Sequence, residues 1–150
     1  MTVFTTPVGN LEVLHDECFI YASHFTKAPA DAHFNHIEHQ IAHELTRYFE
    51  HPDHRFKLKL KSSSSDFQKR LHHALLDIPS GETLTYGALA ARLNSSPRAV
   101  GQACKKNPLV LFIPCHRVVA QTGLGGYMGN ANAIEIKIAL LRHEGVNIQP

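Results

Sequence analysis

The chain has 150 residues, of which 43% are hydrophobic and 19% are charged, a composition typical of one or two folded domains and not of a disordered chain. No stretch reaches the roughly 18 consecutive apolar residues of a transmembrane helix, and Met1–Asn10 lacks the pattern of a secretory signal, so neither is expected. Three scattered cysteines exclude a disulfide framework and favour a reducing, cytoplasmic environment.

The formal net charge of +2 is unevenly distributed. Residues 1–60 carry five Lys and Arg against eight Asp and Glu (5 − 8 = −3), whereas residues 61–150 carry ten against five (10 − 5 = +5). This asymmetry favours two units, of which the second faces an anion. Uneven surface charge without any partner is the alternative.

The first 60 residues combine strand and helix signals. Three short apolar runs separated by turn residues predict strands at Val3–Thr5, Leu11–Leu14 and Phe19–Ala22. Apolar residues at helical spacing predict a helix over roughly residues 31–50, and alternation of charged and apolar residues predicts a further strand at Arg55–Leu60. Residues 1–61 are therefore expected to form a domain with a small antiparallel sheet and a packed helix.

The chain becomes helical after a polar break at Lys61 and Ser62–Ser65, which is the best candidate for a linker. Asp66 is expected to cap the first helix of this part, which Pro79 ends. A last helix ends at Gly145. Its apolar face is expected at Ile134, Ile138 and Leu141. Residues 62–150 are therefore predicted to form a second, helical domain, and the whole chain an α+β fold.

Two short helices are predicted at Thr85–Leu93, capped by Thr85, and from Pro97, capped by Ser96, to about Lys106. Helices of this length joined by a tight turn have the layout of a helix-turn-helix. The second helix contains the small, uncharged stretch Ala99–Ala103, whereas a helix that reads the major groove usually offers long polar side chains. Small residues suit close approach to other protein or to a narrow groove.

Cys115 is the candidate nucleophile. It is followed by His116, which can take its proton, and by Arg117, which adds positive charge. A thiol with its ordinary pKa of about 8.5 needs such help to become the reactive thiolate. The alternative is a buried cysteine next to an unrelated histidine, because neighbours in sequence are not always neighbours in function.

Pro114–Val118 resembles the active-site signature of the O6-alkylguanine-DNA alkyltransferases. Five more segments resemble family motifs and occur in the family order: Ile78-Pro79 with Gly81, Thr83 and Tyr86; Arg98–Gly101; Asn107-Pro108; Gly125–Tyr127; and Leu140–Gly145. The resemblance covers most of residues 66–150 and, more loosely, Thr6–Leu11. It implies a ribonuclease-H-like N-terminal domain followed by a winged helix-turn-helix domain.

The resemblance also implies a function. Members of this family reverse DNA damage directly by transferring an alkyl group from guanine O6 to their own cysteine, after the base has been flipped out of the duplex. This chain is then expected to be a single-turnover methyltransferase that acts as a monomer on double-stranded DNA containing O6-alkylguanine. No cofactor, metal or membrane is expected.

The resemblance assigns roles to individual residues. Cys115 is the nucleophile, His116 is a base that acts through a bound water, and Glu144 orients His116. Asn107 holds the active-site turn, and Tyr86 donates a proton as guanine leaves. The guanine pocket is implied at Val118, Tyr127, Met128 and Gly129. Arg98 fills the gap left in the base stack, and DNA contacts are implied at Thr83, Ala99, Gly101, Lys105 and Lys106.

Two features depart from the family pattern or are not explained by it. The chain is about three residues longer than usual between Tyr127 and Glu144, through Met128–Ala133. His36, His39 and His43 share one side of the first predicted helix, which suits either a zinc site or, as we expect, a solvated face.

Two other functions remain open at this point. A helix-turn-helix protein that only binds DNA or senses damage would need no cysteine next to a histidine. A cysteine–histidine hydrolase would need no Arg98–Gly101 segment and no basic half.

Overall fold

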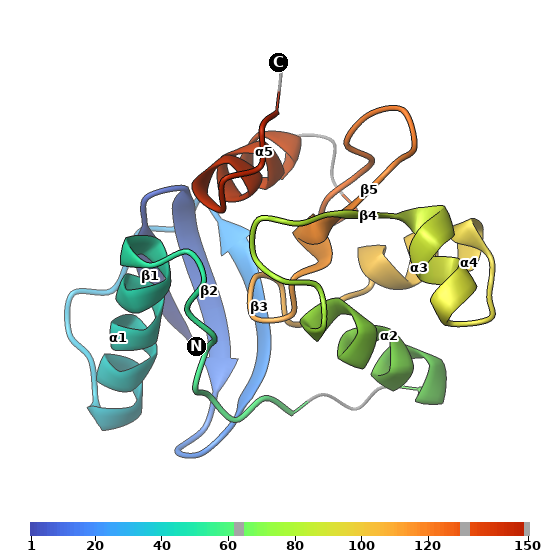
Figure 1. Cartoon of the computed structure of the whole chain (residues 1–150). Coiled ribbons are helices and arrows are strands. Elements are labelled where there is room, and N and C mark those ends of the chain that lie inside the picture. The colour runs from blue at the N-terminus through green and yellow to red at the C-terminus, as the bar shows by residue number, and fades with distance from the viewer. Residues whose placement is uncertain (62–64, 130–132, 149–150) are drawn as a thin grey trace. The chain divides into compact units, whose positions relative to one another are not determined.

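The computed structural model describes residues 1–61, 65–129 and 133–148, so most of the predicted linker, Ser62–Ser64, lies outside the described residues. The chain divides into two compact units. The first is Met1–Ser62 with Pro108–Phe112, and the second is Ser63–Asn107 with Ile113–Pro150. The described residues contain a three-stranded antiparallel sheet and five α-helices, which confirms a mixed α and β fold (Figure 1).

The sheet of the first unit consists of three consecutive strands in the order β1-β2-β3. The strands are β1 at Thr2–Thr6, β2 at Gly9–His15 and β3 at Ile20–Thr26, each longer than the predicted run. Buried residues alternate along the sheet: Thr2, Phe4 and Thr6 in β1, and Leu11 and Val13 in β2. Such alternation gives the sheet one face for the core of this unit.

The predicted strand at Arg55–Leu60 is wrong. In this segment the backbone N–H of Lys57 donates to the carboxylate of Glu44, so it cannot take part in a ladder. One isolated bridge remains, between Leu60 and Ile20 of β3. Further along β3, the backbone of Ser23 pairs with Pro108 and Val110 of the same unit. Two short segments thus cover the outer edge of β3, an edge that would otherwise expose unpaired backbone groups.

Helix α1 spans His36–Glu50, so the predicted start at residue 31 is wrong. Asp31 exchanges backbone and side-chain hydrogen bonds with Val3 of β1, which holds it out of the helix. The helix begins after Asn35, whose side chain accepts a hydrogen bond from the Glu38 amide at 3.0 Å. The Glu38 carboxylate in turn accepts from the Asn35 amide at 2.8 Å, completing a capping box.

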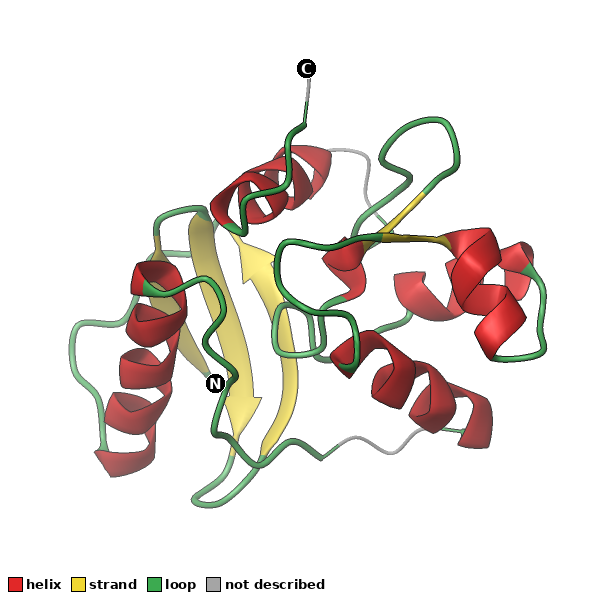
Figure 2. Cartoon of the chain, in the orientation of Figure 1, coloured by secondary structure: helices red, strands yellow, loops and turns green. Residues whose placement is uncertain are grey.

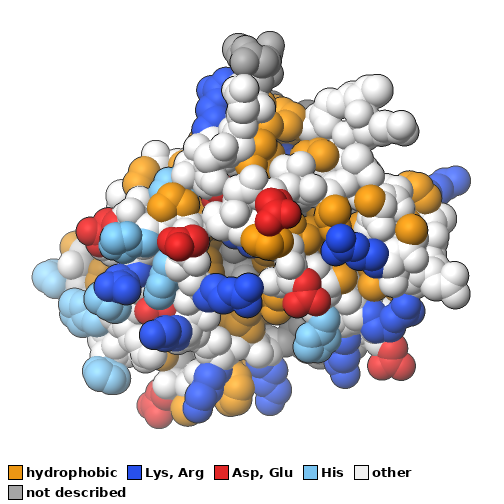
Figure 3. Space-filling model, viewed as in Figure 1, with side chains coloured by type: hydrophobic (Ala, Val, Ile, Leu, Met, Phe, Trp, Pro, Cys, Tyr) orange, Lys and Arg blue, Asp and Glu red, His pale blue; other side chains and the backbone are white. Residues whose placement is uncertain are grey.

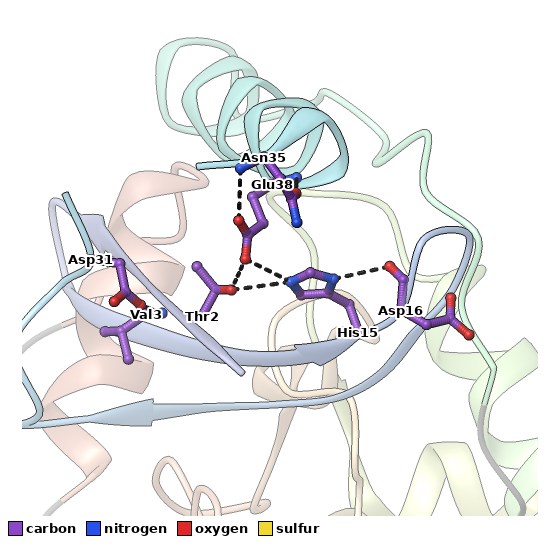
Figure 4. A network of polar contacts seen from close by, with 7 residues as sticks. All are labelled: Thr2, Val3, His15, Asp16, Asp31, Asn35 and Glu38. Carbon is purple, nitrogen blue, oxygen red and sulfur yellow. Dashed lines mark hydrogen bonds and ion pairs between the residues drawn. The ribbon is translucent and has the colours of Figure 1, made fainter. Parts of the chain in front are cut away.

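The same Glu38 carboxylate connects α1 to the sheet (Figure 4). It accepts a hydrogen bond from the Thr2 hydroxyl and lies 3.1 Å from His15 Nε2, while His15 Nδ1 lies 3.0 Å from the carbonyl oxygen of Asp16. The Asn35 amide, and then the Thr2 hydroxyl, lower the pKa of Glu38, so it is ionised at neutral pH. One charged side chain therefore fixes the start of α1 against β1 and β2.

Histidines gather on the outer surface of α1, where they form the pale blue area at the left of Figure 3. His36, His39 and His43 are exposed. Within the described residues, no group of three or more potential metal ligands comes together.

Helices are the main regular elements of the second unit (Figure 2). Its first helix, α2, spans Asp66–Leu76, and its cap is Ser65 rather than the predicted Asp66. Helix α3 at Tyr86–Arg92 is capped by Thr85, and α4 at Pro97–Lys105 is capped by Ser96, both as predicted. Asn94 adopts a positive φ of 52° in the turn between α3 and α4. The two short helices pack against each other.

Two short strands that the sequence did not predict join distant segments of the second unit. β4 at Leu84–Thr85 pairs in parallel with β5 at Val118–Val119. A 3-10 helix, η1 at Cys115–Arg117, leads directly into β5. The last helix, α5 at Ile134–His143, packs against η1.

The predicted apolar face of α5 is only partly right. Leu141 is buried, but Ile134 and Ile138 are half-buried, and the other two fully covered side chains are Leu140 and Lys137. No helix in the described part of the chain is long and apolar enough to cross a membrane.

Candidate active site

Cys115 is the first residue of η1 and is 5% exposed. Its backbone amide donates to the Ile113 carbonyl at 2.8 Å, and the side-chain amide of Asn107 donates to the same carbonyl at 3.0 Å. Asn107 thus braces the tight turn that ends at the cysteine.

Burial raises the pKa of the Cys115 thiol, while a hydrogen bond from Asn107 and the positive charge of Lys137 oppose that rise. Since burial is the larger effect, Cys115 rests as a neutral thiol near pH 7. A neutral thiol is a weak nucleophile, so the site needs a base that removes its proton as it reacts.

His116 is fully buried, and its Nε2 lies 2.9 Å from Oε2 of Glu144. Burial would raise the pKa of Glu144, but the hydrogen bonds from His116 and Arg117 outweigh it and lower the pKa to about 2. An ionised carboxylate can only accept hydrogen bonds, so the proton of the imidazole resides on Nε2. Nδ1 then carries the lone pair.

The other ring nitrogen is therefore the basic one. Nδ1 of His116 is buried and has no hydrogen-bond partner within the described residues. Burial also lowers the pKa of His116, although Glu144 partly opposes this, so the ring is neutral at neutral pH and ready to accept a proton.

Arg117 holds the Glu144 carboxylate in place. Its Nε donates to Oε1 of Glu144 at 2.9 Å and one terminal nitrogen donates to Oε2 at 2.8 Å, a bidentate pair. The other terminal nitrogen donates to the Ile78 carbonyl at 2.7 Å. Gly81 (φ 88°) lies close by, and a Cβ there would come within 3.0 Å of the Glu144 carbonyl oxygen. A larger residue at position 81 would displace the backbone of Glu144 and with it the carboxylate.

Cys115 opens into a pocket of about 410 Å³. Six other residues that the sequence analysis singled out line it: Tyr86, Arg98, Gly101, Lys105, Tyr127 and Met128. The remaining lining residues are Pro97, Gln102, Cys104 and Gly126. Side chains from α3, α4 and the segment after β5 thus converge on the cysteine.

The other predicted site residues lie outside the lining of this pocket. Val118 is buried in β5, Ala99 is half-buried in α4, and Thr83 is half-buried just before β4. Lys106 is exposed at the C-terminal cap of α4, and Gly129 is exposed with φ 65°. In the longer segment Met128–Ala133, the positions Asn130–Asn132 lie outside the described residues.

Tyr86, the first residue of α3, forms one wall of the pocket. Burial raises the pKa of its hydroxyl, with smaller contributions from Cys104 and Cys115, while the Gly126 amide donates to it and opposes the rise. Gly125 (φ 73°) packs against the ring so closely that a Cβ there would lie 2.7 Å from the hydroxyl oxygen. Tyr86 is therefore held as a neutral hydrogen-bond donor.

The family model for the DNA-binding domain of 6-O-methylguanine DNA methyltransferase matches residues 66–146. A methylated-DNA–protein-cysteine methyltransferase of Sulfolobus acidocaldarius is 35% identical over 148 residues, which cover 98% of this chain and 94% of the relative. This chain belongs to the 6-O-methylguanine DNA methyltransferase family. A second relative with the same name, from Archaeoglobus fulgidus, is 42% identical over 129 residues. The match covers 83% of this chain and 84% of that relative.

A solved structure gives the same family. The crystal structure of Mycobacterium tuberculosis OGT in complex with DNA matches this chain with a TM-score of 0.80 and 30% sequence identity. The match covers 96% of this chain and 92% of that one. The similarity therefore includes both units and not only the segment around the cysteine.

Three residues of this methyltransferase site make contributions that are not expected from the sequence. Arg117, expected only to add positive charge near Cys115, holds the Glu144 carboxylate. Cys104 lines the pocket with a thiol whose pKa burial raises to about 12. Lys137 is fully buried, and its spacing indicates this: it lies three and four residues before the core residues Leu140 and Leu141, whereas Glu135, the other charged residue of the stretch Ile134–Leu141, is exposed.

The ion pair predicts a specific dependence of stability on pH. Because the pKa of Glu144 is lowered from 4.5 to about 2, its ionised form stabilises the fold above pH 4.5, and this contribution disappears as pH falls toward 2. Replacing Glu144→Gln should lower the free energy of unfolding near neutral pH by on the order of 3 kcal/mol, and by much less near pH 2.

Chemical denaturation at several pH values measures this difference. Glu135→Gln, an exposed position in the first turn of α5, the helix that Glu144 caps, is the matched control and should follow the wild-type curve. A difference between Glu144→Gln and wild type that stays constant down to pH 2 would contradict the assignment of the ion pair.

Proposed function

We propose that this protein repairs DNA by transferring an alkyl group from O6 of guanine to Cys115. The observation that carries the proposal is the buried array in which Arg117 and Glu144 fix the tautomer of His116 beside a cysteine that opens into a pocket. The names of the relatives support the same reaction, and the complex of the similar M. tuberculosis protein with DNA supports DNA as the partner.

The reaction balances with the groups at the site. As the thiol sulfur attacks the alkyl carbon, its proton passes to Nδ1 of His116 through a water molecule, a new S–C bond forms and the C–O6 bond breaks. The electron pair of the broken bond stays on guanine, which takes up a proton. Tyr86 supplies a hydrogen bond or proton to the departing base, and Asn107 keeps the cysteine turn in place. No electrons are exchanged with an outside donor or acceptor.

Transfer should occur once per protein molecule. The product is a thioether, which has no good leaving group at the pH of the cell. Restoring the thiol would require a nucleophile attacking the same buried carbon, and the site directs its base toward the cysteine instead. The protein would therefore act as a stoichiometric acceptor.

The chain would consist of two domains, of which the second contacts the DNA. We infer that residues 1–61 form a ribonuclease-H-like domain and residues 62–150 a winged helix-turn-helix domain, with α3 and α4 as the helix pair. The α4 residues Ala99 and Gly101 would allow close approach to the minor groove, while Thr83, Lys105 and Lys106 contact the DNA backbone. Tyr127 and Met128, which line the pocket, would enclose the flipped guanine, whereas Val118 and Gly129 lie outside that lining.

Intact-protein mass spectrometry tests the proposal. Wild-type protein mixed with a duplex that contains O6-methylguanine should gain the mass of one CH₂ group on Cys115, with at most one transfer per molecule. Cys115→Ala should gain nothing while still binding DNA, and His116→Ala should react about 10²–10⁴-fold more slowly.

Two other results of this experiment would point to a different function. Sustained transfer beyond one group per molecule would contradict the stoichiometric mechanism. An unchanged mass with tight binding to the modified duplex would indicate a damage sensor that does not transfer the group.

Arg98 provides a second prediction, about base flipping. It is exposed at the start of α4 and lines the pocket, so its planar side chain can enter the space that the extruded base leaves. Extruding a base costs a few kcal/mol in lost stacking and pairing, so an occupant of that space favours the flipped state. Arg98→Ala should therefore slow transfer from duplex DNA much more than transfer from free O6-alkylguanine.

Parallel rate measurements on the two substrates make the test, with Arg92→Ala, exposed at the end of α3, as the control. Equal losses on both substrates would mean that Arg98 supports the pocket or the fold instead of the flipped DNA.

A further inference from the structure

Lys137 is a fully buried charge that the mechanism above does not use. Its Nζ donates to three backbone carbonyls, those of Val118 at 2.7 Å, Leu124 at 2.6 Å and Gly126 at 2.9 Å. A lysine ammonium has three N–H donors, so all of them are satisfied. All three acceptors belong to the one segment 118–126, which α5 therefore holds through a single side chain.

This segment leads into the pocket wall. Gly126 lines the pocket, and its amide donates to the Tyr86 hydroxyl. Gly125 packs against the Tyr86 ring, and Lys137 Nζ itself lies 5.9 Å from the centre of that ring. The conformation of residues 124–126 thus fixes the position of the Tyr86 hydroxyl. Lys137 holds that conformation by binding the carbonyls of Leu124 and Gly126.

We propose that Lys137 is a positioning residue whose ammonium group clamps residues 118–126, and through Gly126 places Tyr86 and the pocket wall for alkyl transfer. Lys137 does not touch the substrate. The inference rests on the proposed function, since it concerns the rate of that same transfer.

The clamp needs the charged form of the lysine. A neutral amine keeps only two N–H donors, so deprotonation leaves one of the three carbonyls without its partner. Burial lowers the pKa of Lys137 to about 8, while Cys115 and Cys104 partly oppose the shift. The titratable groups around it are Cys104 on α4, Cys115 and His116 on η1, and Tyr86 on α3. Of these, the two thiols favour the charged form.

Rising pH therefore has two opposite effects on transfer. It helps to ionise the thiol of Cys115, and it releases the clamp as Lys137 loses its proton. Replacing Lys137→Arg separates them, because a guanidinium remains protonated throughout the accessible range.

The experiment measures the rate of transfer from free O6-methylguanine and from duplex DNA between about pH 7 and pH 10. For the wild type, the rate should stop rising, or fall, above about pH 8, whereas Lys137→Arg should continue to rise with pH. Lys137→Met should be about 10²-fold slower on both substrates at every pH, with an unchanged Kd for DNA. Lys69→Met, exposed on α2, is the matched control and should behave as wild type.

A measurement on the wild-type protein covers the case in which a variant fails to fold. NMR signals of the Gly126 amide and the Tyr86 ring should change together, with a midpoint near pH 8 that matches the Lys137 side chain. Lys137→Met reacting at the wild-type rate, or Gly126 and Tyr86 signals that do not follow Lys137, would overturn the inference. Failure of the wild type to accept an alkyl group at any pH would instead contradict the proposed function, so the two failures are distinguishable.

Discussion

The buried carboxylate of Glu144 is the constraint on which the active site depends. Burying a charge is costly unless the charge is paired and hydrogen-bonded. Here Arg117 binds both carboxylate oxygens, and His116 binds one of them. Because the carboxylate stays ionised, it accepts the Nε2 proton of the imidazole and leaves Nδ1 as the only basic nitrogen of that ring.

Several features of the second unit support this array of Arg117, Glu144 and His116. The carbonyl of Ile78 accepts the third hydrogen bond of Arg117, and Gly81 leaves room for the Glu144 backbone. η1 places Cys115, His116 and Arg117 in three consecutive positions, so one turn carries the buried thiol, the imidazole and the guanidinium that binds the Glu144 carboxylate. α5 brings Glu144 to this turn, and it also carries Lys137, which acts on the pocket wall.

Much of the fold could be predicted from local signals. Thr85 and Ser96-Pro97 are caps whose effect is confined to one helix turn, and both were predicted correctly. One error is local, the cap of α2 at Ser65 instead of Asp66, and two larger ones involve partners far away in the sequence. Asp31 pairs with Val3 instead of starting α1, and Lys57 bonds to Glu44 instead of extending the sheet, because tertiary contacts outweighed the local pattern.

The site shows the same contrast between local signals and contacts distant in sequence. A motif of adjacent residues identified Cys115 and His116, and the resemblance placed Glu144, whose carboxylate the structure puts 2.9 Å from the imidazole. The pairing of β4 with β5 joins two-residue segments that carry too few residues for a periodic signal. The spacing of Lys137 from Leu140 and Leu141 indicates that it is buried, but its role is not predictable from sequence, because its three partners are backbone carbonyls, which no side-chain pattern reveals.

The position of the imidazole proton tests this account most directly. NMR of protein labelled with ¹⁵N in histidine distinguishes a protonated from a non-protonated ring nitrogen, and the signals of His116 can be assigned by comparison with His116→Ala. The account predicts a neutral ring at pH 7 with the proton on Nε2 and a bare Nδ1. A proton on Nδ1, or on both nitrogens, would contradict it, because His116 could then not accept the proton of Cys115.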